Sequence, residues 1–177
     1  MTVTIDITQS AVLTALGNFL TLILPAGTEI VIGQQNNVPE PTSPNFVIMT
    51  PMLPTRLDTT SDTYDYAANQ FSQVSTQLTV QCDFHGPAGG DNVTMFTTLF
   101  RDQYACNFFA NQTIAACQPL YTSDPRQQPF INGEANYEYT WTVDAEIQFN
   151  PTITVTQQFA NTLSLSGVLQ VDATYPP

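Results

Sequence analysis

The chain has 177 residues, of which 42% are hydrophobic and only 10% are charged, against about 25% in typical globular domains. The missing charge is replaced by 26 Thr, 16 Gln, 12 Asn and 8 Ser residues, and there is no lysine. The chain has three arginines and fifteen Asp and Glu residues, so the net charge is -12. So few cations exclude a nucleic-acid binder that neutralises phosphates and a protein that binds anionic membrane surfaces.

The length and the hydrophobic content predict a single domain over residues 1–177. No apolar run reaches the ~18 residues that a membrane-spanning helix requires. The N-terminus lacks the basic start of a secretory signal, so we expect a soluble protein made inside a cell. Cys82, Cys106 and Cys117 form no C-x-x-C pair, and their odd number favours free thiols in a reducing compartment.

Two segments have helical periodicity. In residues 8–24 the apolar side chains recur on one helical face, Thr8 or Ser10 can cap the start, and Pro25 follows the end. Residues 89–105 have a second apolar stripe, with Asp91 in the first turn, where a helix favours negative charge. The sequence therefore predicts two helices.

The clearest strand pattern is the alternation from Tyr137 to Phe149, which runs through thirteen residues without a fault. Such a strand spans roughly 40 Å. It is long enough to serve a core at one end and an exposed ribbon or a neighbouring molecule at the other. Shorter strands are expected at residues 29–33, 77–85, 118–121, 152–155 and 163–171.

Residues 45–57 begin as a buried strand. Pro51 and Pro54 cannot donate to a strand ladder, so its second half is expected at a sheet edge or a bulge. Residues 58–74 are polar with spaced aromatic side chains, and we interpret them as a protruding loop or hairpin arm. An ordinary mobile loop is the alternative for this segment.

Residues 34–44 and 122–133 are rich in turn-forming residues and are expected to be loops. Helices interleave with strands along the chain, but they are too few for repeated βαβ units. The expected fold class is therefore α+β: a mixed or mainly antiparallel β-sheet with two helices packed on one face, plus the protruding arm.

The candidate catalytic residues do not assemble into a known site. Strand alternation places His85, the only histidine, on the opposite face from Cys82, so the two are poor partners for a metal or for nucleophilic catalysis. Asp83 shares the His85 face, where we expect a surface pair without a catalytic role. Cys106 and Cys117 could approach His85 only through the fold, and this set lacks zinc-ligand spacing.

Sequence motifs also give no indication of a catalytic site. A P-loop is impossible without lysine, and neither G-x-G-x-x-G nor G-x-S-x-G occurs. The carboxylates Asp62 and Asp65, or Glu138 and Asp144, are conceivable as a glycosidase pair, but we expect them to be solvated. We therefore expect no catalytic, cofactor-binding or metal-binding residues and no enzymatic activity.

The rare arginines are candidate contact residues. Arg101 lies beside the apolar stripe of the second helix, and Arg126 follows Asp124-Pro125, where it could clamp a carboxylate bidentately. For each arginine we favour a local salt bridge within the subunit, and a bridge between subunits is the alternative.

Six segments along most of the chain carry a family resemblance. They are LTLILPAGTEIVIGQQNNVPEP, NFVIMTPML, TQLTVQCDFHGPAGGDN, TLFRDQYAC, QPLYTSDPRQQPFINGE and VDATYPP. None is a catalytic motif, and the resemblance rests on the order and number of the segments. In this order they resemble the tailed-phage proteins called neck or tail-terminator (head–tail joining) proteins.

The resemblance implies a non-enzymatic virion component with a compact α+β subunit, located in the neck and assembled in the host cytoplasm. Proteins of this kind form rings, commonly sixfold, that cap the tail tube and give the head a docking surface. The implied partners are further copies of the chain in a homohexamer ring, the tail tube protein, the head–tail connector or adaptor, and sheath or collar proteins. DNA is implied to pass through the lumen without specific binding, and no membrane is involved.

The composition is compatible with such a role. Neutral Thr, Gln and Asn surfaces can pair between subunits without the cost of desolvating charge, and a channel wall poor in cations would not hold passing DNA. Many extracellular β-domains share a lysine-free polar surface, so a monomeric β-rich receptor-binding or adhesin-type module is the alternative. A hydrolase that uses cysteine or carboxylates is a third, weaker hypothesis.

Overall fold

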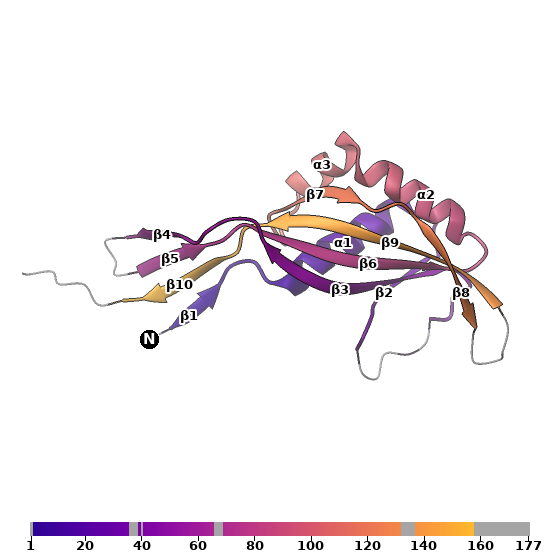
Figure 1. The fold of residues 1–177 in the computed structure, drawn as a ribbon, viewed down its shortest axis with the longest axis horizontal. Helices are drawn as coiled ribbons and strands as arrows, with labels where there is room; N and C mark the ends of the chain where they lie inside the picture. Colours follow the sequence, from indigo (N-terminus) through magenta and orange to yellow (C-terminus); the bar gives the residue numbers. More distant parts are fainter. Residues whose placement is uncertain (1, 36–38, 40, 66–68, 132–136, 158–177) are drawn as a thin grey trace, which may run out of the picture.

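The computed structural model describes residues 2–35, 39, 41–65, 69–131 and 137–157 (Figure 1). The elements in this part of the chain follow in the order β1 (Val3–Ile5), α1 (Gln9–Ile23), β2 (Glu29–Ile32), β3 (Phe46–Arg56), β4 (Ser61–Tyr64), β5 (Asn69–Gln73), β6 (Thr76–His85), α2 (Gly89–Phe100), α3 (Gln103–Ala110), β7 (Cys117–Thr122), β8 (Arg126–Ile131), β9 (Tyr137–Phe149) and β10 (Thr152–Thr156). The predicted strand at residues 163–171 lies outside the described residues.

The strands form two sheets. The larger sheet has six strands in the order β2-β3-β6-β9-β7, and β8 also pairs with β9. The smaller sheet has four strands in the order β1-β10-β5-β4. Within the described residues, β2 and β3 pair in parallel, whereas the other strand pairs are antiparallel. The predicted α+β class with a mixed sheet is therefore confirmed.

Helix α1 forms as its sequence predicts. The Thr8 side chain accepts a hydrogen bond from the backbone N–H of Ala11 (3.2 Å), which satisfies one of the free donors of the first turn. Leu24 leaves the helix in an extended conformation before Pro25. The apolar stripe is buried along its length, with Phe19 fully enclosed.

The prediction of one helix over residues 89–105 is wrong, because this segment contains two helices. Helix α2 ends at Phe100, and Asp102 adopts an extended conformation (φ -97°, ψ 163°) that interrupts the helix. The Asp102 side chain accepts a hydrogen bond from the backbone N–H of Tyr104 (2.8 Å), so it acts as the N-cap of α3. The described residues therefore hold three helices, and the last one continues to Ala110.

The three helices cover one face of the six-stranded sheet and share one core with it. Phe19 of α1 contacts four phenylalanine rings of α2 and α3 at centroid distances of 5.3 to 6.5 Å: Phe96, Phe100, Phe108 and Phe109. From the sheet, alternate residues of β6 and β9 enter the same core, as their period-two patterns predict: Leu78, Val80, Cys82, Phe84, Val143, Ala145, Ile147 and Phe149.

Two strands near the sheet edges differ in how well the sequence predicted them. In β3 the register shifts between Pro51 and Leu53, and β2 pairs only with Phe46 to Met49, so the second half lies at an edge with a bulge, as predicted. In contrast, the expected loop at residues 122–133 is wrong in part, because Arg126–Ile131 forms β8. The long strand β9 provides a pairing partner that outweighs the local turn signals.

The four-stranded sheet is a continuation of the six-stranded one. Thr76 of β6 lies opposite Phe149 of β9. Three residues before Thr76 and three residues after Phe149, Gln73 of β5 lies opposite Thr152 of β10. The ladder therefore keeps one register across the bend between the sheets. Figure 1 shows the helices over the six-stranded sheet and the four-stranded sheet beyond its end.

The segment 58–74 contains β4 and β5, which pair with each other in the four-stranded sheet. The alternative of an ordinary loop is wrong over these two strands. That the segment protrudes as a loop or hairpin arm stays a prediction.

Candidate assembly surfaces

The four-stranded sheet presents an uncovered apolar face. Val3 lies opposite Val155 and Ile5 lies opposite Ile153, so these four side chains share one side of the sheet. None of the residues of β1, β4, β5 and β10 is buried. In the described part of the chain no helix or second sheet covers this face (Figure 1). A sheet normally buries its hydrophobic face against another layer, so this face is suited to a contact with another molecule.

The opposite side of the same sheet is different in chemistry. It carries Thr4 of β1, Thr154 of β10 and Phe71 of β5, which are aligned by the strand register, and Thr63 of β4 follows them. Neighbouring residues in one strand, such as Thr4 and Ile5, therefore belong to opposite faces. They provide matched positions for testing which face makes a contact.

Hydrogen bonds hold the bend between the two sheets. The Asp58 carboxylate accepts from the backbone N–H of Ser75 (2.9 Å) and from its hydroxyl (2.8 Å). On the other side, Asp6 accepts from the backbone N–H of Thr152 (2.7 Å), and its own N–H donates to the Thr152 carbonyl (3.2 Å). These contacts fix the direction in which the four-stranded sheet leaves the core.

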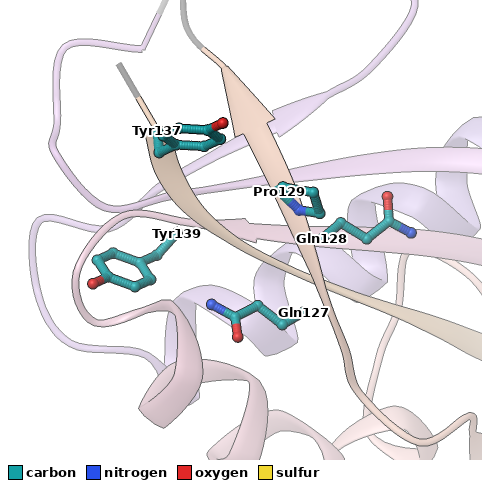
Figure 2. Close-up of a pocket in the computed structure, with 5 residues that line it drawn as sticks. All are labelled: Gln127, Gln128, Pro129, Tyr137 and Tyr139. Carbon is teal, nitrogen blue, oxygen red and sulfur yellow. The ribbon is translucent and has the colours of Figure 1, made fainter.

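A second exposed surface lies at the opposite end of β9. Tyr137 and Tyr139 continue the core-facing row of β9 beyond Trp141, but they are 79% and 64% exposed. They line a groove of about 390 Å³ together with Gln127, Gln128 and Pro129 of β8, as Figure 2 shows. Among the described residues, this "tyrosine groove" is lined by two aromatic rings, one proline and two amides. The Asp91 carboxylate lines a neighbouring pocket that shares Gln127 and Tyr139 with the groove.

On the polar face of the six-stranded sheet, neutral side chains donate hydrogen bonds to the carboxylates. Glu146 accepts hydrogen bonds from the Thr79 hydroxyl (2.8 Å) and the Gln77 amide (2.9 Å). Asp83 accepts from the Thr142 hydroxyl (2.6 Å) and from the Gln81 amide. The carboxylates on this face are therefore stabilised mainly by hydroxyl and amide donors rather than by cations.

Both candidate arginines make contacts within the subunit, but only Arg126 forms the local salt bridge that we favoured. Arg126 forms a salt bridge with Asp144 at 3.2 Å, with 62% of the arginine side chain exposed. Arg101 differs from the expectation of a salt bridge, because its guanidinium donates to the hydroxyl (3.2 Å) and to the backbone carbonyl of Thr122. This pair of hydrogen bonds ties the end of α2 to the end of β7.

The expected position of His85 as a surface residue is wrong. Its ring stacks on Phe46 at a centroid distance of 4.4 Å, and Nδ1 lies 3.1 Å from the Thr140 hydroxyl. Only 5% of His85 is exposed, because β3 and β9 enclose it from both sides. Cys82 points into the core on the other side of the sheet, as its alternation predicted.

Two of the three cysteines, Cys82 and Cys117, pack in the core like small hydrophobic residues. Burial raises the pKa of the Cys82 thiol far above its ordinary value, and the nearby charge of Asp83 raises it further. Burial also raises the pKa of Cys117 to about 11. Cys106 is only half-buried in α3. Thiols with raised pKa values carry little thiolate and are poor nucleophiles.

Three carboxylates of the candidate pairs, those of Asp62, Asp65 and Asp144, have local partners, and that of Asp144 is Arg126. Asp62 accepts from the Ser72 hydroxyl (2.6 Å), and Asp65 accepts from the backbone N–H of Asn69 (2.8 Å). The side chain of Glu138 lies outside the described atoms. Among the described residues, no three His, Cys, Asp or Glu side chains lie close enough to hold a metal ion, and no helix is long and apolar enough to cross a membrane.

The sequence pattern missed the exposed face of the four-stranded sheet, whereas it did predict that one end of the long strand serves an exposed ribbon or a neighbouring molecule, and Tyr137 and Tyr139 are exposed there. The available signals were the alternation of Val3 and Ile5 with Thr4 and Asp6, and the two tyrosines at the start of the long strand. Neither signal shows by itself whether a side chain is covered. That information comes from where the helices end on the sheet.

Two solved structures are similar to this chain. One is the sheath/tube terminator of PVC, an extracellular contractile injection system, solved by cryo-EM in the extended state, with 15% identity and a TM-score of 0.46 over 95% of this chain. This chain spans 65% of the length of that terminator. The other, which has no functional name, has 13% identity and a TM-score of 0.43 and is matched over 89% of this chain and 100% of its own length.

The comparison with curated proteins gives no significant match. A family model described as phage neck terminator protein matches residues 10–171. Because this match extends over most of the sequence, the chain belongs to the phage neck terminator family.

Proposed function

We propose that this chain, a virion component by its family, forms a closed homohexameric ring that caps the tail tube and joins it to the head connector. The single observation that carries the proposal is the four-stranded sheet, whose apolar face of Val3, Ile5, Ile153 and Val155 has no covering layer within the described chain. An isolated sheet of this kind gains stability when its apolar face is buried. Assembly into a ring provides that burial.

The charge distribution supports assembly through neutral surfaces. A chain with a net charge of -12 repels further copies of itself wherever carboxylates face each other. Among the described residues, the uncovered sheet face carries one carboxylate, Asp62, which accepts a hydrogen bond from Ser72, and the residues that line the tyrosine groove are uncharged. Two copies can therefore meet there with few carboxylates to bury.

The proposed role is structural and involves no bond-making chemistry. The buried thiols have raised pKa values, His85 is enclosed between Phe46 and Thr140, and the carboxylates accept local hydrogen bonds. These features favour stable packing over reactive side chains.

The proposed partners are the tail tube protein on one side of the ring and the head–tail connector or adaptor on the other, with sheath or collar proteins beside it. The ring is assembled in the host cytoplasm. DNA passes through its lumen without specific binding, because the wall of an acidic, lysine-free protein offers few cations to phosphate.

Deletion of the gene in the parent phage, followed by electron microscopy of the tails, tests the proposal. We expect tail tubes of uncontrolled length and heads without tails, and complementation with the intact chain restores both. Normal tail length and normal joining without this chain would contradict the proposal. A protein that stays monomeric in particles and binds glycans would favour the receptor-binding alternative.

A further inference from the structure

We infer that neighbouring copies join head to tail: the apolar face of the four-stranded sheet in one copy packs into the tyrosine groove of the next. The inference rests on the proposed ring and adds the surfaces that build it. The face consists of Val3, Ile5, Ile153 and Val155, and the groove is centred on Tyr137 and Tyr139.

The two surfaces lie at opposite ends of the molecule. The four-stranded sheet lies at one end of the long axis, and the paired ends of β8 and β9 that form the groove lie at the other (Figure 1). The same strand path connects them, because β9 begins with Tyr137 and Tyr139 and continues into β10, which carries Ile153. From Tyr139 to Ile153 this path covers at most roughly 45 Å at ~3.3 Å per residue.

The two tyrosines of the groove and the apolar face belong to one continuous sheet face, whereas Gln128 lies opposite Thr140 on the other side. Tyr137 and Tyr139 follow the core-facing row of β9, and Ile153 and Val155 continue that row because the register does not shift at the bend. The helices cover only the middle of this face (Figure 1). The core-facing side of the sheet is therefore apolar beyond the helices at both ends.

The chemistry of the two surfaces is complementary. On β1 and β10 the sheet offers branched aliphatic side chains, whereas β5 and β4 place Gln70, Ser72, Tyr64 and Asp62 on the same face. Asp62 is the one carboxylate among these described residues, and it accepts a hydrogen bond from Ser72. The groove offers two tyrosine rings and Pro129, with the amides of Gln127 and Gln128 at its side (Figure 2). Tyrosine is enriched in the buried centres of protein interfaces, where its ring buries apolar area and its hydroxyl keeps a polar partner.

A second copy explains why two such surfaces occur on one molecule. A contact with a different protein requires only one patch. A head-to-tail contact requires two different patches on each subunit, and it forms a ring when the rotation closes. The described residues of the two patches include one carboxylate, Asp62, so two copies of an acidic protein can meet there with little repulsion.

The first test compares two adjacent exposed residues of the edge strand β1. Ile5→Asp places a carboxylate on the apolar face, whereas Thr4→Asp, the matched control, adds the same charge to the opposite face. We expect Ile5→Asp to reduce the fraction of chain in rings on tails by about tenfold or more, and Thr4→Asp to leave it near the unmodified value. Native mass spectrometry of necks released from tails measures this fraction, and circular dichroism checks that each variant is folded.

The second test uses disulfide cross-linking to ask whether Ile153 of one copy lies beside Tyr139 of the next. Ile153→Cys combined with Tyr139→Cys should give a covalent ladder of subunits when assembled tails are oxidised, and Thr154→Cys with Tyr139→Cys should give none. Each single variant controls for the native thiols. This test stands even where a charged variant fails to fold.

The outcomes separate the two proposals. A ring that forms equally well with Ile5→Asp and Thr4→Asp, without the Ile153–Tyr139 ladder, would overturn this contact and leave the ring intact. Unmodified tails whose necks hold this chain only as single, separate subunits would overturn the proposed function itself.

Discussion

The Asp58 carboxylate accepts two hydrogen bonds from Ser75, one from the backbone N–H at 2.9 Å and one from the hydroxyl at 2.8 Å. Asp58 follows β3 and Ser75 precedes β6, so this pair closes the bend at which the six-stranded sheet passes into the four-stranded sheet. The orientation of the proposed docking face depends on this bend.

The bend should weaken in acid. The Ser75 hydroxyl, the Ser75 N–H and the charge of Arg56 hold the pKa of Asp58 below its ordinary value of 3.8. A carboxyl with a lowered pKa contributes stability that is complete above its unfolded pKa and is lost as pH falls through the folded value. We expect Asp58→Asn to melt at a lower temperature than the unmodified chain at neutral pH, and the difference to shrink as the pH falls below the ordinary pKa of 3.8.

Calorimetry across this pH range measures the effect. Ser75→Ala is the matched control, because it removes the hydroxyl donor and leaves the carboxyl in place. A melting difference between Asp58→Asn and the unmodified chain that is the same at every pH would contradict the role of the ionised carboxylate.

The turn at Gly86 should tolerate no side chain. Gly86 has φ +95°, and a Cβ atom there would lie 1.9 Å from the Pro44 carbonyl oxygen. We expect Gly86→Ala to destabilise the protein by about 3 kcal/mol or more. Gly27 has a similar φ of +92° with open space around it, so Gly27→Ala should cost only about 1 kcal/mol. Urea unfolding measures both values, and equal losses would show that the close approach to Pro44 is unimportant.

The aromatic core should depend on one ring of α1. Phe19 contacts rings from both α2 and α3 and is fully buried, so Phe19→Ala removes the contact that unites three helices. We expect a loss of about 3 to 5 kcal/mol in the free energy of unfolding. Leu22→Ala in the exposed part of the same helix should change it by less than about 0.5 kcal/mol. A Phe19→Ala variant as stable as Leu22→Ala would contradict the shared core.

The thiols should differ in reactivity. Cys82 and Cys117 are buried with raised pKa values, whereas Cys106 is half-buried on a surface helix. We expect Ellman's reagent at about pH 8 to modify only Cys106 rapidly in the folded protein and all three thiols in denaturant. Cys106→Ser should abolish the rapid phase. Rapid modification of that variant would show that the core opens more readily than its packing implies.

The sequence predicted the elements whose patterns are local and long. The helical stripe with its Thr8 cap, the alternation of β6 and β9 and the irregularity at Pro51 each follow from side chains close together in the chain. The break between α2 and α3 was missed because Phe100 and Tyr104 fit one helical stripe. The N-cap preference of Asp102 decides the structure there.

The assembly surfaces could not be predicted in the same way. Ile5 and Ile153 become neighbours only when the two ends of the described chain pair, and the pattern of each short strand is too brief to show this. The exposure of Tyr137 and Tyr139 depends on where α2 begins over the sheet, beside Trp141. Coverage of a face is a property of tertiary packing, and the alternation of a strand reveals only which residues share that face.

Electron cryomicroscopy of the neck in intact particles tests the central claim most directly. We expect density for this chain to form one closed collar of six subunits at the end of the tail tube, with each four-stranded sheet against the next subunit. Density for isolated copies on the outside of the tail, or no density for this chain in the neck, would contradict the account.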